Sequence, residues 1–547
     1  MRIVLLVCTS LAWARGSVAD EREIVVYGGS ASGIVAGIQA KCMGKSVVVI
    51  EPTRRIGGLT TGGLGQTDIG NKAAIGGLAR DFYRAVKRHY ESPEAWKWQA
   101  RSAYRSHGQS HTASGEDAMW TFEPGAALAI LEAWVAEHGL EIVRGERLDR
   151  ETGVVVVPGE VPQIASIRME SGRVFTGRMF IDATYEGDLM AAAGVRYALG
   201  REANADHGET FNGVQLARAE HHQFKPGVDP YRTAGDPASG LLPFVEAADP
   251  SPDGTGDRRV QAYTFRMCLT DHPDNRIPFA KPEGYDPEWH ELLLRNFEAG
   301  ERQVPWINSP MPNRKTDTNN RQGVSTDFIG ENHDYPDASY ARRDEIVARH
   351  RLYQQGLMWT LANHPRVPEE IRREVSRWGM CRDEFVEGGG WQEQLYIREA
   401  RRMIGAYLVT EADCLGPRLI DDGVGLAAYQ IDSHNVRRLV MPDGTVRNEG
   451  DVQVGGFEPF PISYRALTPK AAECGNLLVP VCLSATHVAY GSIRMEPVFM
   501  VLGQSAATAA AQAIDQGCAV QAVDGQRLRD RLVADGQILA WDRKQKK

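Results

Sequence analysis

The stretch that decides the fold runs from Glu23 to Gly65, EIVVYGGSASGIVAGIQAKCMGKSVVVIEPTRRIGGLTTGGLG. Ile24 to Tyr27 is a short apolar run of the kind that a parallel sheet buries on both faces. Apolar and small residues from Gly33 onward then have the spacing of a helix packed on that sheet, and Val47 to Ile50 is a second buried strand that ends at Glu51. This order predicts a dinucleotide-binding βαβ unit.

The turn between the first strand and the helix is made of small residues. In such a unit the free N–H groups and the positive dipole end of the helix face a pyrophosphate, and the acid after the second strand, here Glu51, accepts a ribose hydroxyl. A serine stands where the fingerprint has its middle glycine, and we expect its side chain to narrow the approach to the ligand. The alternative is a purely structural βαβ unit. The predicted contacts in the turn are Gly28, Gly29, Ser30, Ala31, Ser32 and Gly33.

A glycine-rich segment follows the acid. Residues 59–65, LTTGGLG, are too rich in glycine for a helix or a central strand. An acid-ended strand followed by a Gly-Gly loop resembles the glutathione-reductase-like class of FAD-binding proteins, which implies that this loop meets the ribityl chain and the flavin. The alternative is a flexible surface loop. The predicted cofactor contacts here are Arg55, Gly57, Gly58, Thr60 and Thr61.

Length and composition limit the class of protein. A chain of 547 residues is expected to form two or three domains. The net charge of −9 does not indicate a basic surface for nucleic acid, so no nucleic-acid partner is predicted. No run of 18 or more apolar residues is present, so no transmembrane segment is predicted. The eight cysteines stand at wide spacings, which favours inert buried thiols over a disulfide framework, an iron–sulfur cluster or a metal site.

The N-terminus has the pattern of a signal peptide. Arg2 precedes an apolar run, and Ser17 to Ala19 offers a small-x-small cleavage site. We therefore expect residues 1–19 to be a signal peptide and the protein to be periplasmic or extracellular. An extra strand or a mis-assigned start is the alternative.

The predicted architecture is α/β: a Rossmann-like FAD-binding domain with a parallel sheet and a β-meander, plus a large, mainly α (α+β) substrate domain. The third parallel strand is Glu141 to Arg144, and turns separate the meander strands at Val154–Val157, Gln163–Met169 and Val174–Ile181. The clearest helices of the substrate domain are expected at Arg343–Thr360, Pro368–Trp378 and Gln394–Thr410. The predicted divisions are 23–200 for the first part of the FAD-binding domain, 201–470 for the substrate domain, 471–520 for the return to the FAD-binding domain and 521–547 for a C-terminal tail.

Three further stretches carry a specific family resemblance. Residues 182–195, DATYEGDLMAAAGV, with GRE at 200–202 and ATHVAYGSIRMEP at 485–497, resemble a family of FAD-dependent oxidoreductases whose members are often labelled xanthan-lyase-like. That label carries little weight, because elimination from a polysaccharide needs no redox cofactor. The resemblance implies that Asp182, Ala183 and Thr184 face the dinucleotide. It also implies that the final helix, in which Pro497 is predicted to be the first residue, points its positive end at the flavin and stabilises its reduced form. The predicted cofactor contacts here are Glu496 and Pro497.

Candidate catalytic residues follow from the chemistry of hydride removal, which needs a base. We expect His487, in the loop before Pro497, to lie beside the flavin, and His434 is the second candidate; either could instead be a structural histidine. Tyr490 and Arg494 could orient a substrate, although Arg494 could pair with Glu496 instead.

Three functions remain open from the sequence. The first is oxidation of a small hydroxylated substrate, such as a sugar or glycoside, with an unknown electron acceptor; the chain has no second nucleotide fingerprint, which argues against bound NAD(P)H. The second is a lyase or isomerase that retains FAD without net redox change. The third is a non-catalytic flavoprotein or carbohydrate-binding module. The oligomeric state is not indicated.

Overall fold

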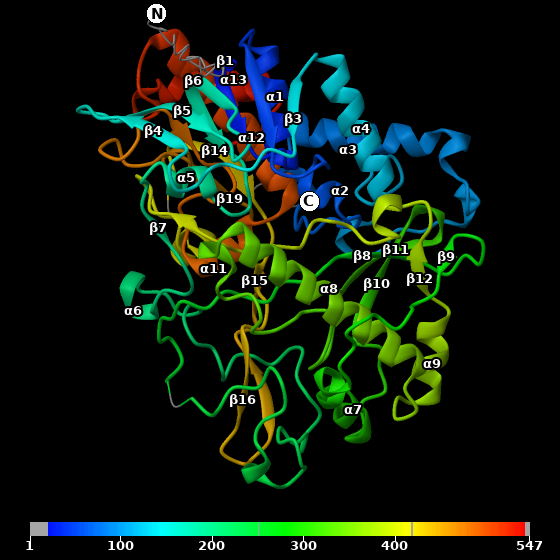
Figure 1. Ribbon diagram of the computed structural model, residues 1–547. Helices are drawn as coiled ribbons and strands as arrows, with labels where there is room; N and C mark the ends of the chain where they lie inside the picture. Colours follow the sequence, from blue (N-terminus) through cyan, green and yellow to red (C-terminus); the bar gives the residue numbers. More distant parts are fainter. Residues whose placement is uncertain (1–19, 250, 417–418, 542–547) are drawn as a thin grey trace, which may run out of the picture.

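The computed structural model describes residues 20–249, 251–416 and 419–541 (Figure 1). The predicted signal peptide, residues 1–19, lies outside the described residues, as do residues 542–547 of the predicted tail. The upper half of the molecule in Figure 1 contains the parallel sheet and its helices, and the lower half contains most of the chain between residues 201 and 470.

The first half of the fold is a seven-stranded sheet in the order β3-β2-β1-β6-β5-β4, with β20 paired to β6. Strands β3, β2, β1, β6 and β20 are parallel, and β5 and β4 run antiparallel at one side. This confirms the predicted α/β class. The strands are β1 (Asp20–Tyr27), β2 (Val47–Glu51), β3 (Glu141–Arg144), β4 (Val154–Val157), β5 (Gln163–Arg168), β6 (Val174–Asp182) and β20 (Leu477–Leu478).

Strand β6 belongs to both the meander and the parallel sheet. Its first residues pair with β5, as Ser166↔Thr176 shows, and its last residues pair with β20, as Leu477↔Phe180 shows. Along its whole length it also pairs with β1, and the register places Asp182 beside Tyr27. The carboxyl ends of β1 and β6 therefore lie together at the edge where the glycine turn begins.

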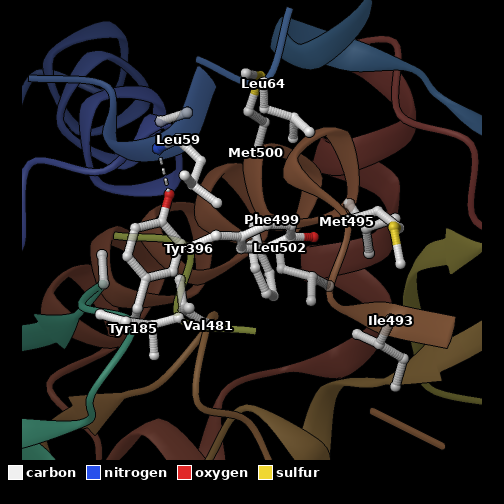
Figure 2. Packing of buried hydrophobic residues seen from close by; sticks show 14 of the residues in the cluster. Leu59, Leu64, Tyr185, Tyr396, Val481, Ile493, Met495, Phe499, Met500 and Leu502 are labelled. Carbon is white, nitrogen blue, oxygen red and sulfur yellow. Dashed lines mark hydrogen bonds between the residues drawn. The ribbon is translucent and has the colours of Figure 1, made fainter. Parts of the chain in front are cut away.

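Two apolar helices pack against this sheet. Helix α1 (Ala31–Cys42) and helix α12 (Glu496–Gln516) lie side by side, and nearly all residues of both are buried. Gly503 allows the close contact, since a Cβ there would stand 2.3 Å from the Ser32 carbonyl oxygen. Figure 2 shows the buried side chains at the N-terminal end of α12, where Phe499, Met500 and Leu502 pack near Leu59 and Tyr185. Helices α3 (Gly77–Glu91), α4 (Pro124–Glu137) and α5 (Asp188–Ala192) complete this half.

Helix α12 is the one described helix that is long and apolar enough to cross a membrane, and all of its apolar window is buried inside the protein. Its composition is that of a core helix packed on both α1 and the sheet.

The second half combines helices with an antiparallel sheet, as its predicted α+β character requires. A five-stranded sheet has the order β10-β11-β8-β12-β9, and four further pairs are two-stranded. The sheet strands are β8 (Met267–Thr270), β9 (Arg276–Ile277), β10 (Trp306–Met311), β11 (Lys315–Asn320) and β12 (Gly379–Cys381). The two-stranded pairs are β13 (Arg402–Met403) with β7 (Tyr197–Ala198), β14 (Gly423–Ala427) with β19 (Phe460–Ser463), β15 (Ile431–Ser433) with β18 (Val452–Val454), and β16 (Arg437–Val440) with β17 (Val446–Glu449). The helices are α6 (Asn204–His207), α7 (Glu291–Glu298), α8 (Tyr340–Asn363), α9 (Glu369–Ser376) and α10 (Glu411–Leu415).

One local prediction was wrong. Residues 394–410 form no helix, because their arginines and Glu399 each point to partners in other segments and the chain runs largely extended, with only β13 as regular structure. The predicted tail contains helix α13 (Gly525–Ala534), and just beyond it the Gln537 side chain donates to the Val501 carbonyl of α12 at 3.0 Å.

Candidate active site

The glycine turn brings β1, α1 and β6 into close contact. Gly28 has a φ of +103°, and a Cβ there would stand 2.7 Å from the Ala183 carbonyl carbon and from the Thr184 nitrogen. A Cβ on Gly33 would stand 1.9 Å from the Gly28 carbonyl oxygen. Glycine is therefore required at both positions, one for its backbone conformation and both for lack of space.

Ser30 does not narrow the ligand approach, contrary to our expectation. Its hydroxyl donates to the Ala183 carbonyl at 2.7 Å and accepts from the Gly33 N–H at 3.3 Å, so the side chain points inward and caps helix α1. Serine is a favoured N-cap residue for this reason. Ser30 thus takes the place of the fingerprint's middle glycine. Because its side chain points inward, it stays away from the outer side of the turn, where backbone N–H groups are expected to meet the ligand.

Glu51 joins the end of β2 to the glycine turn. Its carboxylate accepts from the Gly29 N–H at 2.7 Å and from the Thr53 N–H at 2.7 Å, and burial raises its pKa. Each oxygen retains a lone pair, so the carboxylate can still accept a hydroxyl proton.

Ser32, in the first turn of α1, has a buried hydroxyl oxygen with no hydrogen-bond partner among the described residues. This oxygen lies against helix α12, since a Cβ on Gly503 would stand 2.7 Å from it. The glycine turn, the N-terminus of α1 and the buried acid at the end of β2 together fit the pyrophosphate and ribose of a dinucleotide.

The Gly-Gly segment is helical over one turn, where a non-helical loop was expected. Helix α2 (Gly58–Thr61) begins after Gly57, whose left-handed backbone conformation only glycine adopts easily. The Arg55 Nε donates to the Thr61 carbonyl oxygen at 2.9 Å, which closes the turn. The second glycine is needed for space, since a Cβ on Gly58 would stand 2.2 Å from the Tyr185 hydroxyl oxygen.

The three segments predicted to meet the flavin are joined through Glu496. The Tyr185 hydroxyl donates to one carboxyl oxygen and the Thr60 hydroxyl to the other, both at 2.7 Å. Burial raises the pKa of Glu496 to about 7. Glu496 is the first residue of α12 and Pro497 the second, one position later than predicted. Figure 2 shows Tyr185 reaching Leu59, whose N–H donates to the tyrosine hydroxyl at 2.9 Å.

Asp182, at the end of β6, holds the neighbouring turn. Its carboxylate accepts from the Thr184 N–H and hydroxyl and from the Met190 N–H, at 3.1, 2.7 and 2.8 Å. Burial raises its pKa to about 6. Ala183 donates its N–H to Tyr27 and accepts the Ser30 hydroxyl. Asp182 to Thr184 therefore fix the segment that packs against the glycine turn of the predicted dinucleotide site.

His434 follows β15 and is held by a buried carboxylate. Its Nδ1 lies 2.7 Å from an Asp327 oxygen, and its Nε2 lies 3.6 Å from an Asp432 oxygen, beyond hydrogen-bond distance. Burial lowers the pKa of His434. Burial alone raises the pKa of Asp327, but Arg398, at 2.9 Å, and His434 lower it to about 2. The pair therefore combines an ionised carboxylate with an open Nε2, meaning one that has no hydrogen-bond partner among the described residues.

His487 is the first residue of helix α11 (His487–Ile493), so it lies in a helix and not in the expected loop. Its Nδ1 lies 2.7 Å from a Glu399 oxygen and its Nε2 lies 3.1 Å from the Ser433 hydroxyl. Gln261 connects the two histidines, since its side chain donates to Glu399 at 3.0 Å and accepts the His434 N–H at 3.1 Å. Both predicted histidines therefore belong to one network, in which the two ring nitrogens of His487 are both engaged.

Arg494 pairs with Asp432, and not with Glu496. Its guanidinium lies 3.1 Å from an Asp432 oxygen and donates to the Tyr396 hydroxyl at 2.9 Å, while its Nε is buried without a partner among the described residues. Tyr490 is buried, and its ring lies 6.3 Å from that of Phe499. His487, Tyr490, Arg494 and Glu496 thus all lie on the segment 487–496. This segment connects the histidine network to the part of the dinucleotide site where the flavin is predicted to bind.

Several titratable side chains near this network have pKa values shifted towards their neutral forms. Burial raises the pKa of Asp68 to about 6 and that of Asp451 to about 8. Burial lowers the pKa of His222 to about 4, with His434 contributing in the same direction. The described residues contain no group of three or more histidines, cysteines or acids that could hold a metal ion.

Sequence reasoning missed the residues that orient the histidines. Glu399 lies in the segment 394–410, which was predicted to be a helix, and Ser433, directly before the candidate His434, was given no role. Asp327 and Gln261 carried no signal, because each is more than 100 residues from its histidine or carboxylate partner. A single sequence does not show which polar residues meet across such separations.

A parallel sheet with a glycine turn, a capped helix and a buried acid defines the class of proteins that bind a dinucleotide on a Rossmann-like sheet. The model of the family described as FAD dependent oxidoreductase matches residues 23–532. The chain therefore belongs to the FAD-dependent oxidoreductase family, and FAD is its cofactor. The xanthan-lyase-like label is not confirmed.

Comparison with solved structures gives partial similarities. A flavin monooxygenase from Stenotrophomonas maltophilia is 21% identical over 36% of this chain and 45% of its own, with a TM-score of 0.19. An anhydrotetracycline hydroxylase from Streptomyces rimosus is 12% identical over 37% of this chain and 41% of its own, with a TM-score of 0.23. The chain thus spans less than half of each of these two proteins. No curated protein matches the chain.

Proposed function

We propose that the protein oxidises a small hydroxylated substrate, such as a sugar or glycoside, at the His434 network and passes the electrons to a separate acceptor. The observation that carries this proposal is the His434–Asp327 pair, 2.7 Å apart, with an open Nε2 next to the segment that bears Glu496. We also propose that the protein works in the periplasm or outside the cell, on the basis of the signal-peptide pattern at residues 1–19.

The residues that would hold FAD fall into two groups. The glycine turn, the N-terminus of α1 and Glu51 would take the pyrophosphate and the ribose, while α2, Tyr185 and the N-terminus of α12 would surround the ring system. When bound, FAD supplies an acceptor for hydride at N5.

His434 is the stronger candidate for the base. A general base must present an unoccupied nitrogen to the substrate proton, and the Nε2 of His434 does so while both ring nitrogens of His487 have partners. Burial lowers the pKa of His434, so the imidazole is neutral near pH 7 and can accept a proton. Asp327 fixes the ring and stabilises the imidazolium that forms. His487 acts as a positioning residue through Ser433, which precedes His434 in the chain.

The neighbouring groups favour a hydroxylated substrate. Asp68 and Asp451, with raised pKa values, and His222, with a lowered one, offer neutral or easily neutralised hydrogen-bonding groups. Such groups bind substrate hydroxyls better than a charged substrate group, because an uncompensated charge would be costly to bury beside them. The Asp432–Arg494 pair adds one acceptor and one donor within the same region.

The test is anaerobic titration of the purified protein with a panel of sugars, sugar acids, polyols and amino acids, monitored by flavin absorption. We expect the oxidised-flavin bands to bleach with one hydroxylated class. Persistence of the bands against the entire panel would contradict the proposal.

A lyase or isomerase function is the alternative, because His434 and its carboxylates could equally move a proton without net redox change. The two are distinguished by turnover under anaerobic conditions without any electron acceptor. Product formation beyond one equivalent of FAD in that assay would favour the alternative, and a single turnover would favour the oxidoreductase.

A further inference from the structure

Two cysteines that are far apart in sequence face each other in the five-stranded sheet. Strand β12 pairs antiparallel with β8 in a register that sets Gly379 opposite Thr270 and Met380 opposite Leu269. The next position of that register sets Cys381 opposite Cys268. The two Sγ atoms lie 3.6 Å apart.

The geometry of such a pair suits a covalent bond. Directly opposed residues of an antiparallel pair have Cα atoms about 4.5–5.5 Å apart, within the range of about 4.4–6.8 Å that disulfides span. Both side chains are fully buried and share a small cluster with Met311 and Phe385. A small rotation of two side chains therefore brings the sulfurs to bonding distance without moving either strand.

We propose that Cys268 and Cys381 are joined by a cross-strand disulfide in the mature protein. The sequence gave no sign of it, because 113 residues separate the two thiols and the cysteine spacings resemble no disulfide framework. The inference does not depend on the substrate or on the flavin chemistry proposed above. It is consistent with folding in an oxidising compartment.

The reaction is an exchange with an external disulfide, either a small one such as oxidised glutathione or that of a thiol oxidase. One cysteine attacks as its thiolate and forms a mixed disulfide; the other then displaces the carrier thiol. The two cysteines lose two protons and two electrons in total, and the carrier disulfide gains both and becomes two thiols. Because both side chains are fully buried in the folded protein, the exchange takes place before β12 closes against β8.

The other buried thiols have different surroundings and provide a matched control. Cys474 is equally buried, but its thiol donates to an Asn476 side-chain oxygen at 3.5 Å. We therefore expect Cys474→Ala to leave the disulfide intact, whereas Cys268→Ala and Cys381→Ala each remove it.

The test is peptide mapping of the full-length protein isolated after export to an oxidising compartment, with alkylation in denaturant before trypsin digestion. We expect the peptide MCLTDHPDNR, residues 267–276, to be linked to WGMCR, residues 378–382, and to separate on reduction. Recovery of both peptides only in alkylated form, with no linked species, would overturn the proposal.

A second measurement compares the unfolding temperature of wild-type protein from two sources, so its main result does not require any variant to fold. Protein made in a reducing cytoplasm should lack the link and unfold about 4 °C lower, because the cross-link removes entropy from the unfolded chain. The Cys474→Ala control should retain this difference between the two preparations, and Cys268→Ala should abolish it. An identical unfolding temperature for wild-type protein from both sources would also contradict the bond.

Discussion

The glycine turn at residues 28–33 and the histidine network around His434 and His487 work in different ways. In the turn, backbone N–H groups and the absence of side chains create the site, and every part comes from one continuous stretch plus the end of β6. In the network, side chains from several distant segments meet, and each histidine is oriented by a carboxylate from another segment. Binding that rests on the backbone is visible in local sequence, and chemistry that rests on side chains is not.

The largest effect should follow from filling the turn. Gly33→Ala places a Cβ 1.9 Å from the Gly28 carbonyl oxygen, so helix α1 must shift away from β1. We expect purified Gly33→Ala to contain almost no FAD and to lose about 1–3 kcal/mol of stability. The ratio of flavin to protein absorption measures the first effect and urea unfolding the second.

Gly525→Ala is the matched control, because a Cβ there meets no atom within 4 Å. It should keep normal FAD content and stability. If Gly33→Ala bound FAD as well as the control, the turn would not be the site of the dinucleotide.

The second effect should separate chemistry from binding. His434→Gln removes the open Nε2 while leaving the glycine turn untouched, so we expect normal FAD content and a rate of flavin reduction lower by about 10²–10⁴-fold. Stopped-flow reduction with a substrate found in the anaerobic panel gives the rate. The half-buried His138, whose Nδ1 lies 2.9 Å from the Trp134 carbonyl oxygen in α4, provides a control in His138→Gln. An equal loss of rate in both variants would remove His434 from the mechanism.

The third effect concerns pH and Glu496, where the two regions meet. Burial raises the folded-state pKa of Glu496 to about 7, above the value of about 4.3 expected in the unfolded chain. The folded protein therefore binds more protons in this window, and the contribution of Glu496 to stability is present below pH 4.3 and is lost as pH rises through 7. The pKa difference corresponds to a loss of about 4 kcal/mol.

Glu496→Gln cannot titrate, so it should lack this part of the pH dependence. Urea unfolding of FAD-free wild-type and variant protein between about pH 4.5 and about pH 7.5 covers the range in which Glu496 titrates. The difference between the two proteins isolates the contribution of this one carboxyl from those of other acids. Parallel curves for the two proteins would show that Glu496 keeps an ordinary pKa.

The smallest effect should come from Ser30. Its hydroxyl caps α1 and bonds to Ala183, so Ser30→Gly removes those bonds but no ligand contact. We expect a loss of about 1 kcal/mol in stability and FAD affinity within about twofold of wild type. A tenfold gain in FAD affinity, measured by fluorescence titration of the apoprotein, would mean that the serine obstructs the ligand after all.

The sequence predicted the parts of the fold that repeat a local pattern. The βαβ unit, the third parallel strand and the meander appear where apolar runs alternate with glycine turns, and α8 and α9 follow clear helical spacing. The segment 394–410 was predicted wrongly because its regular mixture of apolar and charged residues resembles an amphipathic helix. In the structure, Arg398, Arg401 and Arg402 instead reach Asp327, Asp188 and Glu202.

The candidate site was predictable only in part for the same reason. His434, His487 and Arg494 were found because reactive residue types stand in short polar motifs, but their partners were assigned wrongly or not at all. Glu496, the nearest acid in sequence, was the alternative partner considered for Arg494. In the structure Glu496 accepts from Tyr185 and Thr60, and Arg494 pairs with Asp432. Contacts between distant segments depend on tertiary packing, which local spacing does not encode.

The measurement that tests the central claim most directly is a parallel anaerobic titration of wild-type protein and His434→Gln, each with its FAD content determined beforehand. The account predicts equal FAD content in the two proteins, bleaching of the wild-type flavin by a hydroxylated substrate, and a variant flavin that stays oxidised over the same period. Bleaching of both proteins at the same rate, or loss of FAD from the variant, would contradict the separation of a backbone site for the cofactor from a side-chain site for the chemistry.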